Sequence, residues 1–287
     1  MEWSHEYQAN VPAVPARVFR ALTVPEELTQ WLAEHVEVEP RAGGRFAMWG
    51  RHTPGTPPAP RDADRLVSLV ADERLEFSWE FLGVPGVVTL QCAPEGEETR
   101  LSVRHTLRGE LAMPRAREFV DDWWRLVFAN LCAWVSGGRG LCRVDFADPA
   151  PEVRLTIDIA APREAVFRAL LDPALVNQWI AKSATIEPQV GGRYDLGWRY
   201  EVDGREVVGG TTRILELREP EYLVLDWLDW RGDASVTGQY IAFTLEALPT
   251  GTRVHFRHAG FSRPGDISDY AFGWVYFLDR LAALFPA

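Results

Sequence analysis

One pattern occurs twice in this chain, and the repetition limits the folds open to it. The paired segments lie 148 residues apart: Phe19-Arg20-Ala21-Leu22 and Phe167-Arg168-Ala169-Leu170, Trp31 and Trp179, Gly43-Gly44 and Gly191-Gly192. A period of this size is a whole domain, because solenoid repeats are only about 20–50 residues long. A chain of 287 residues also has the length of about two domains. We therefore expect one domain over residues 1–138 and another over 150–287, joined by a Gly- and Pro-rich linker.

Each copy shows the same order of hydrophobic patterns. Val153–Ile159 alternates apolar and polar residues, as a strand with one buried face does. Two short helical patterns follow, and Pro162 and Pro173 mark helix boundaries. A run of alternating segments then leads to a long helix, predicted over 119–135 in the first copy and 270–284 in the second. This order predicts an α+β fold in which an antiparallel sheet curves around the last helix.

The two copies differ after the paired glycines. In the second copy Tyr194, Leu196, Trp198 and Tyr200 are predicted to share one face of a single strand, and Asp203-Gly204 indicates a tight hairpin. The first copy has the proline-rich segment 52–60 instead. Because proline cannot donate to a central sheet, we expect a long irregular loop there.

Composition excludes several classes of function. The formal net charge is −11, from 41 acidic and 30 basic residues, which is the wrong sign for general binding of nucleic acid or anionic membranes. The three cysteines form no CxxC motif and predict neither a disulfide framework nor a zinc site. The N-terminus does not resemble a signal peptide, and the longest apolar run is too short to cross a bilayer. We expect a cytoplasmic protein without membrane insertion.

The chain resembles a tandem of START-like (Bet v 1-like, SRPBCC) domains, in the branch of the heat-shock protein 90 ATPase activator homologues. The residues that carry the resemblance are Pro162, Phe167–Leu170, Pro173, Trp179, Gly191–Tyr194, Arg253–Phe261 and Gly273-Trp274. The first copy departs at Leu107-Arg108 and at Trp123, which replace Gly260-Phe261 and Gly273. The resemblance implies two helix-grip domains. The superfamily includes lipid carriers, sensors, polyketide cyclases and co-chaperone domains, so several functions remain open.

His105 and His258 occupy equivalent positions on the inward face of one strand in each copy. One interpretation is a polar anchor or acid–base group that titrates near neutral pH. The other is a core histidine hydrogen-bonded to backbone or tryptophan. His255 and His258 point to opposite faces of their strand, so we do not interpret them as a metal pair.

The 12 tryptophans suggest either large cores or a lined cavity. We expect Trp31 and Trp179 to be structural. Asp229 is a candidate anchor for a polar group, although a solvated loop is the commoner role for such a residue. The complete set of predicted ligand-pocket residues is Trp198, Tyr200, Trp227, Asp229, His258, Trp274, Trp79, His105 and Trp124.

Three functions remain from the sequence. The first is a non-enzymatic carrier or sensor that binds a small hydrophobic or amphipathic molecule in an internal cavity. The second is a cyclase or hydrolase that uses a pocket histidine with Asp229. The third is interaction with a chaperone partner. None of the common nucleotide-binding, nucleophile or metal motifs occurs, so we predict no cofactor, metal or assigned catalytic residue. The sequence leaves the oligomeric state open.

Overall fold

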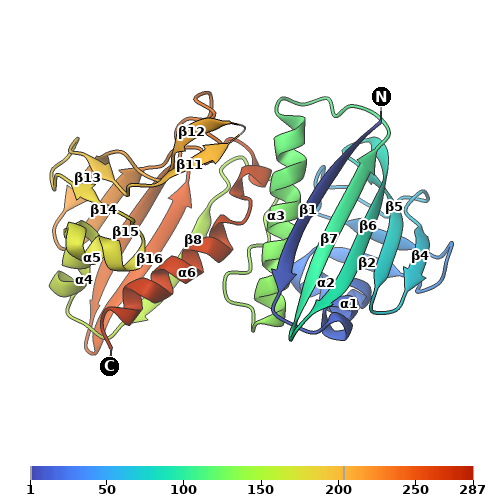
Figure 1. The fold of residues 1–287 in the computed structure, drawn as a ribbon, viewed down its shortest axis with the longest axis horizontal. Helices are drawn as coiled ribbons and strands as arrows, with labels where there is room; N and C mark the ends of the chain where they lie inside the picture. Colours follow the sequence, from blue (N-terminus) through green and yellow to red (C-terminus); the bar gives the residue numbers. More distant parts are fainter. Residues whose placement is uncertain (1, 203, 287) are drawn as a thin grey trace. The chain divides into compact units, whose positions relative to one another are not determined.

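The computed structural model describes residues 2–202 and 204–286 (Figure 1). The chain forms two compact units. Unit 1 contains the residues up to Pro149 together with Arg263–Phe272, and unit 2 contains Ala150–Ser262 together with the residues from Gly273 onward. Unit 1 thus includes a short segment from the second sequence copy. Each unit is described separately below.

Unit 1 is a five-stranded antiparallel sheet with a long helix packed against it, as Figure 1 shows. The strand order is β1-β7-β6-β5-β4. Its elements are β1 (Trp3–Val11), α1 (Pro15–Thr23), α2 (Pro25–Trp31), β2 (His35–Val38), β3 (Phe46–Trp49), β4 (Leu66–Val70), β5 (Arg74–Phe81), β6 (Val84–Glu95), β7 (Glu98–Leu107), α3 (Ala116–Val135) and the 3-10 turn η1 (Pro264–Ile267).

Unit 2 repeats this plan with the order β8-β16-β15-β14-β13. Its elements are β8 (Val153–Ile159), α4 (Arg163–Leu171), α5 (Pro173–Trp179), β9 (Thr185–Ile186), β10 (Tyr194–Asp195), β11 (Arg199–Val202), β12 (Arg205–Val208), β13 (Ile214–Arg218), β14 (Tyr222–Asp226), β15 (Tyr240–Leu248), β16 (Gly251–Ala259) and most of α6 (Tyr270–Ala283). The mixed α+β architecture predicted from the sequence is confirmed in both units.

The residues that define the repeat stabilise the pair of short helices and the glycine turn that follows it. Trp31 and Trp179 are fully buried, and each indole Nε1 donates to a backbone oxygen of the preceding helix. Their predicted structural role is confirmed. In the glycine pair, Gly43 has φ +77°. A Cβ on Gly44 would lie 2.5 Å from the backbone oxygen of Glu39, so only glycine fits at that position.

The strand predicted over residues 194–200 is wrong. β10 ends at Asp195 and β11 begins at Arg199. Between them Gly197 has φ +70°, and its N–H donates to Oδ1 of Asp195 at 2.8 Å. This local turn replaces the strand ladder and breaks the alternation of side chains.

The two loops that distinguish the copies follow the prediction. β11 and β12 pair as antiparallel strands, and Gly204 between them has φ +75°. Its predicted hairpin partner, Asp203, lies outside the described residues. Residues 51–64 of unit 1 form turns and bends without a strand, as the prolines indicated.

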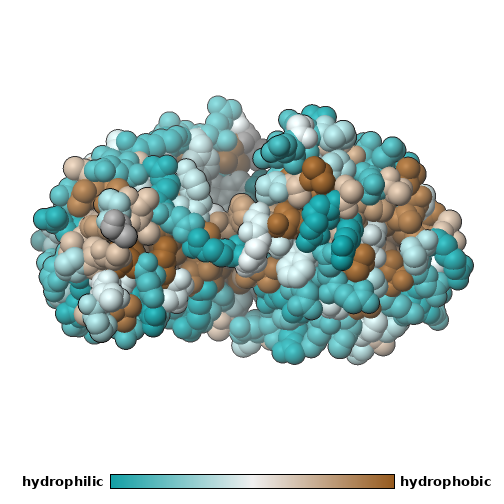
Figure 2. Space-filling view, turned by 90° about the horizontal axis from the view of Figure 1, so that it is seen from below, coloured by the Kyte–Doolittle hydropathy of each residue, from teal (hydrophilic) through white to brown (hydrophobic). Residues whose placement is uncertain are grey.

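The surface drawn in Figure 2 is mainly hydrophilic, with scattered apolar side chains. Such single apolar residues are normal for a protein surface. None of the helices in the described part of the chain has the length and hydropathy needed to span a membrane.

Candidate functional site

A buried histidine links the sheet of unit 2 to its long helix. His258 of β16 is 0% exposed, and its Nδ1 accepts a hydrogen bond from Trp274 Nε1 of α6 at 3.2 Å. Trp227, just beyond β14, completes a three-ring cluster. Its ring centroid lies 5.3 Å from that of His258 and 5.1 Å from that of Trp274. Three of the predicted pocket residues therefore meet in the core.

Unit 1 contains the matching cluster. His105 of β7 is also 0% exposed, and its Nδ1 accepts from Trp124 Nε1 of α3 at 3.2 Å. Trp79 of β5 stacks on the imidazole, with ring centroids 5.6 Å apart and an interplanar angle of 17°. The structure thus brings the second set of three predicted residues together with the same tryptophan–histidine hydrogen bond, although Trp79 stacks on its histidine and Trp227 meets His258 at 63°.

Burial sets the protonation of both histidines. It lowers the pKa of His258 to about 3, and it lowers the pKa of His105 to about 3 with a smaller contribution from the charge of His5. Both rings are neutral at physiological pH. Since Nδ1 accepts the tryptophan N–H, the single imidazole proton lies on Nε2. One of our two interpretations was a histidine that titrates near neutral pH. The low pKa values contradict it, because burial removes the water that would stabilise the charged imidazole.

The remaining predicted residues lie toward the edge of unit 2. Trp198 follows the broken strand, and its Nε1 donates to the backbone oxygen of Ile180 at 3.0 Å. The ring centroid of Trp198 lies 6.0 Å from that of Trp227. The hydroxyl of Tyr200 donates to the backbone oxygen of Trp230 at 2.7 Å. Both side chains are half-buried, and each is hydrogen-bonded to the backbone of a neighbouring loop.

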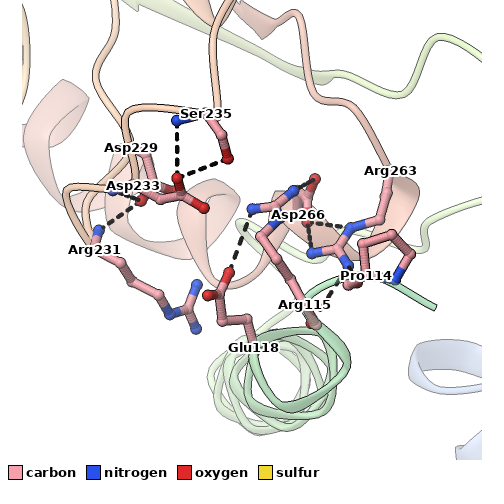
Figure 3. Close-up of polar contacts among 9 residues, drawn as sticks. All are labelled: Pro114, Arg115, Glu118, Asp229, Arg231, Asp233, Ser235, Arg263 and Asp266. Atoms are coloured by element: carbon pink, nitrogen blue, oxygen red, sulfur yellow. Dashed lines mark hydrogen bonds and ion pairs between the residues drawn. The ribbon is translucent and has the colours of Figure 1, made fainter. Parts of the chain in front are cut away.

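Asp229 belongs to the loop after β14. Its Oδ2 accepts from the backbone N–H groups of Arg231 and Asp233, both at 3.0 Å (Figure 3). Asp233 in turn accepts from the backbone N–H of Ser235 at 2.8 Å and from its hydroxyl at 2.7 Å. These bonds hold the loop in shape, so the Asp229 carboxylate has a structural role of its own.

A cavity of about 610 Å³ opens beside this loop in unit 2. It is bounded by β12, the start of β13, the end of β14 and the segment 232–240. Trp227 and Asp229 line it, which connects the cavity to the buried cluster. Its other apolar walls are Val207, Val208, Leu215, Leu228 and Val236, and its polar residues include Arg205, Glu206, Arg213 and Gln239.

Sequence reasoning missed most of this lining. Gln239 lies immediately before β15, two residues before Ile241, which pairs with His258. Comparison of the two copies reveals that Gly86 occupies the matching place in unit 1, because Val88 pairs with His105 as Ile241 pairs with His258. This difference between glycine and glutamine becomes visible only when the two copies are aligned by their strand pairing.

The interior of unit 1 is filled. The space between α3, the short helices and the sheet is about 20 Å³, roughly the room of one water molecule. The predicted linker contributes to this closure. Asn130 of α3 exchanges two hydrogen bonds with the backbone of Cys142, at 2.9 and 2.8 Å. Phe146 then packs against Trp123 and Phe119, with ring centroids 5.6 and 6.3 Å away.

A second charged cluster in unit 1 includes residues from the second sequence copy. The side chain of Asp266 in η1 is only 6% exposed and pairs with Arg263 at 2.6 Å (Figure 3). Arg115 reaches the other carboxylate oxygen at 3.4 Å, and Arg263 also donates to the backbone oxygen of Pro114 at 2.9 Å. The cluster is fully engaged in ion pairs and anchors η1 beside α3.

Metal chemistry has no visible basis in the geometry. No group of three or more His, Cys, Asp or Glu side chains within residues 2–202 and 204–286 is arranged to hold a metal ion. Burial also raises the pKa of all three cysteine thiols to about 11, which keeps them protonated.

Several solved structures are similar to this chain. Protein MLL2253 from Mesorhizobium loti is 27% identical over 46% of this chain and 95% of its own, with a TM-score of 0.38. DynU16, from the dynemicin biosynthetic locus, is 18% identical over 98% of both chains, with a TM-score of 0.41. The Aha1 dimer from Colwellia psychrerythraea is 19% identical over 47% and 95%, with a TM-score of 0.39. No curated protein matches the sequence.

The family comparison agrees with the repeat and with the fold. The model described as "Activator of Hsp90 ATPase homolog 1-like protein" matches residues 12–156 and again residues 160–286. The two matches together span nearly the whole chain, one in each copy. The chain therefore belongs to the family of activator of Hsp90 ATPase homolog 1-like proteins, within the START-like fold, as a tandem of two such domains.

Proposed function

We propose that unit 2 is a non-enzymatic binding module that holds a small amphipathic molecule in the cavity beside β12 and the end of β14. The observation that carries the proposal is the cavity itself. Its volume of about 610 Å³ falls within the roughly 300–1,000 Å³ of known small-molecule sites. Its apolar walls of valine, leucine and tryptophan side chains are also a feature of such sites.

The charges around the cavity favour a ligand without a negative charge. The cavity is lined by more acidic than basic side chains. The acidic residues are Glu206, Asp226, Asp229 and Asp233, and the basic residues are Arg205 and Arg213. A neutral or cationic polar group therefore meets a more favourable field than an anion. The apolar body of the ligand would contribute most of the binding free energy by leaving water.

The state of the histidines argues for binding over catalysis. A general base works best when its pKa lies near the operating pH, and burial lowers the pKa of His258 to about 3. Asp229, the carboxylate that we considered as its partner, accepts two backbone N–H groups of its own loop. In unit 1 the space between the helices and the sheet is about 20 Å³, which is too small for such a ligand.

Equilibrium dialysis of the full chain against 2-methoxynaphthalene tests the proposal. Ala234 lines the cavity and is exposed, so Ala234→Trp should fill the site without disturbing the core. We expect wild-type protein to bind the probe and Ala234→Trp to bind it at least about tenfold more weakly. Ala174→Trp, the same change at an exposed alanine of α5, is the matched control and should bind as wild type does. Absence of binding, or equal binding by Ala234→Trp, would refute the proposal.

A further inference from the structure

We propose that Gln239 selects the ligand of this cavity by accepting a hydrogen bond at its side-chain Oε1, so that a ligand with an O–H or N–H donor is preferred. The inference rests on the proposed function and names the chemical class of molecule that the site would take. That class is a small apolar molecule with one hydrogen-bond donor.

The first observation is a buried hydrogen-bond acceptor that has no donor among the residues that the structure describes. Gln239 lines the cavity and is 5% exposed. Within the described residues, its Oε1 is buried and has no hydrogen-bond partner. Leaving a buried acceptor unsatisfied costs about 1–3 kcal/mol, so native structures rarely contain one without a reason. A ligand that donates to Oε1 would recover this cost on binding.

The second observation is that the backbone fixes the position of Gln239. Its carbonyl oxygen accepts from the backbone N–H of Trp227 at 2.9 Å, immediately before β15 begins. Trp227 also lines the cavity and belongs to the buried cluster with His258. The side-chain amide therefore extends from a backbone that a hydrogen bond holds next to the sheet, as a residue that confers specificity requires.

The third observation is that the matching position of unit 1 carries no amide. Gly86 stands at the matching position of unit 1. A Cβ there would lie 2.7 Å from the backbone oxygen of Thr106 and 3.3 Å from His105 Nε2, so no side chain fits. Unit 1 thus has no polar side chain at this position.

Three of the four described carboxylates that line the cavity already accept hydrogen bonds. Oδ1 of Asp226 accepts from the backbone N–H groups of Thr212 and Arg213, at 2.7 and 2.9 Å. Asp229 and Asp233 accept from their own loop. These bonds compete with a ligand for the carboxylate oxygens. The Gln239 amide has no such competitor for Oε1, and a site that must satisfy a buried polar group discriminates strongly against a ligand that cannot do so.

Two probes of nearly equal shape test the inference by equilibrium dialysis of the full chain. 2-Naphthol carries an O–H donor and 2-methoxynaphthalene does not. We expect wild-type protein to bind 2-naphthol about tenfold more tightly. Gln239→Leu should lose this preference while it still binds 2-methoxynaphthalene, and Gln239→Glu, which keeps an acceptor, should retain it. Gln178→Leu, the same change at an exposed glutamine of α5, should behave as wild type.

The outcomes separate the two proposals. Equal binding of the probes by wild-type protein, or a preference that persists in Gln239→Leu, overturns the role of Gln239 and leaves the binding function standing. Failure of both probes to bind overturns the binding function and, with it, the proposed role of Gln239. If Gln239→Leu does not fold, the wild-type preference and its retention in Gln239→Glu decide the question.

Discussion

The buried histidines predict that acid destabilises each unit by a defined amount. In the folded protein burial lowers the pKa of His258 to about 3, whereas an unfolded histidine has a pKa of about 6.5. Between these values the unfolded chain binds a proton that the folded chain does not. The stability that the neutral ring contributes is therefore complete above about pH 6.5 and is lost progressively as the pH falls toward 3.

The magnitude follows from the size of the shift. Each pH unit below about 6.5 costs about 1.4 kcal/mol per histidine, because the unfolded state gains one more proton than the folded state. At pH 5.0 the loss is about 2 kcal/mol for His258, and it approaches about 5 kcal/mol near pH 3. The ring is 0% exposed, so solvent does not screen the effect.

Urea unfolding at pH 7.5 and pH 5.0, followed by tryptophan fluorescence, measures this loss. His258→Gln replaces the titrating ring with an amide that can still accept the N–H of Trp274. We expect the variant to be less stable than wild type at pH 7.5, and the difference to shrink by about 2 kcal/mol at pH 5.0. His105→Gln should give the same result in unit 1, where Trp124 donates the equivalent hydrogen bond and burial lowers the pKa of His105 to about 3. A difference that does not change with pH would refute the reasoning.

Three further predictions concern stability and are checked by urea unfolding of single variants. Phe146→Ala should destabilise unit 1 by about 1–3 kcal/mol through the loss of apolar contact with Trp123, and unchanged unfolding would show that the linker does not cover α3. Gly86→Ala should cost about 1–3 kcal/mol because a Cβ does not fit, and a neutral effect would contradict the close packing at β6. Asp266→Asn should cost about 3 kcal/mol because it removes a nearly buried ion-pair partner of Arg263, and full stability of this variant would argue against the pair.

Most of the fold could be read from the sequence because its signals are local. The signals are alternating residues, prolines at helix starts and the glycine pair, and each acts within a few positions. All of them occur again in the second copy, which supports the same prediction a second time. The strand predicted over 194–200 was wrong because one side chain, Asp195, captured a backbone N–H and formed a turn. The competition between this side chain and a strand partner for the N–H is also local. The alternating aromatic residues favoured the strand in our prediction.

The site was predictable only in part. Repeated positions identified His105 and His258 and the tryptophans around them, and the structure brings each set together. Their chemistry depends on burial, which no local pattern reports. Gln239 was missed, since an amide before a strand carries no signal until its neighbours are known.

Periodicity and turn chemistry are properties of neighbouring residues, so the amino-acid pattern alone predicts one α+β domain made twice. The packed structure was needed to show that the space beside α3 of unit 1 is filled and that a cavity opens beside β12 of unit 2. Phe146, from beyond the last helix of the first copy, packs into unit 1, whereas Val207 and Gln239 border an open space in unit 2. A cavity is whatever volume the side chains of distant segments leave unfilled, and that volume exists only once the chain has packed.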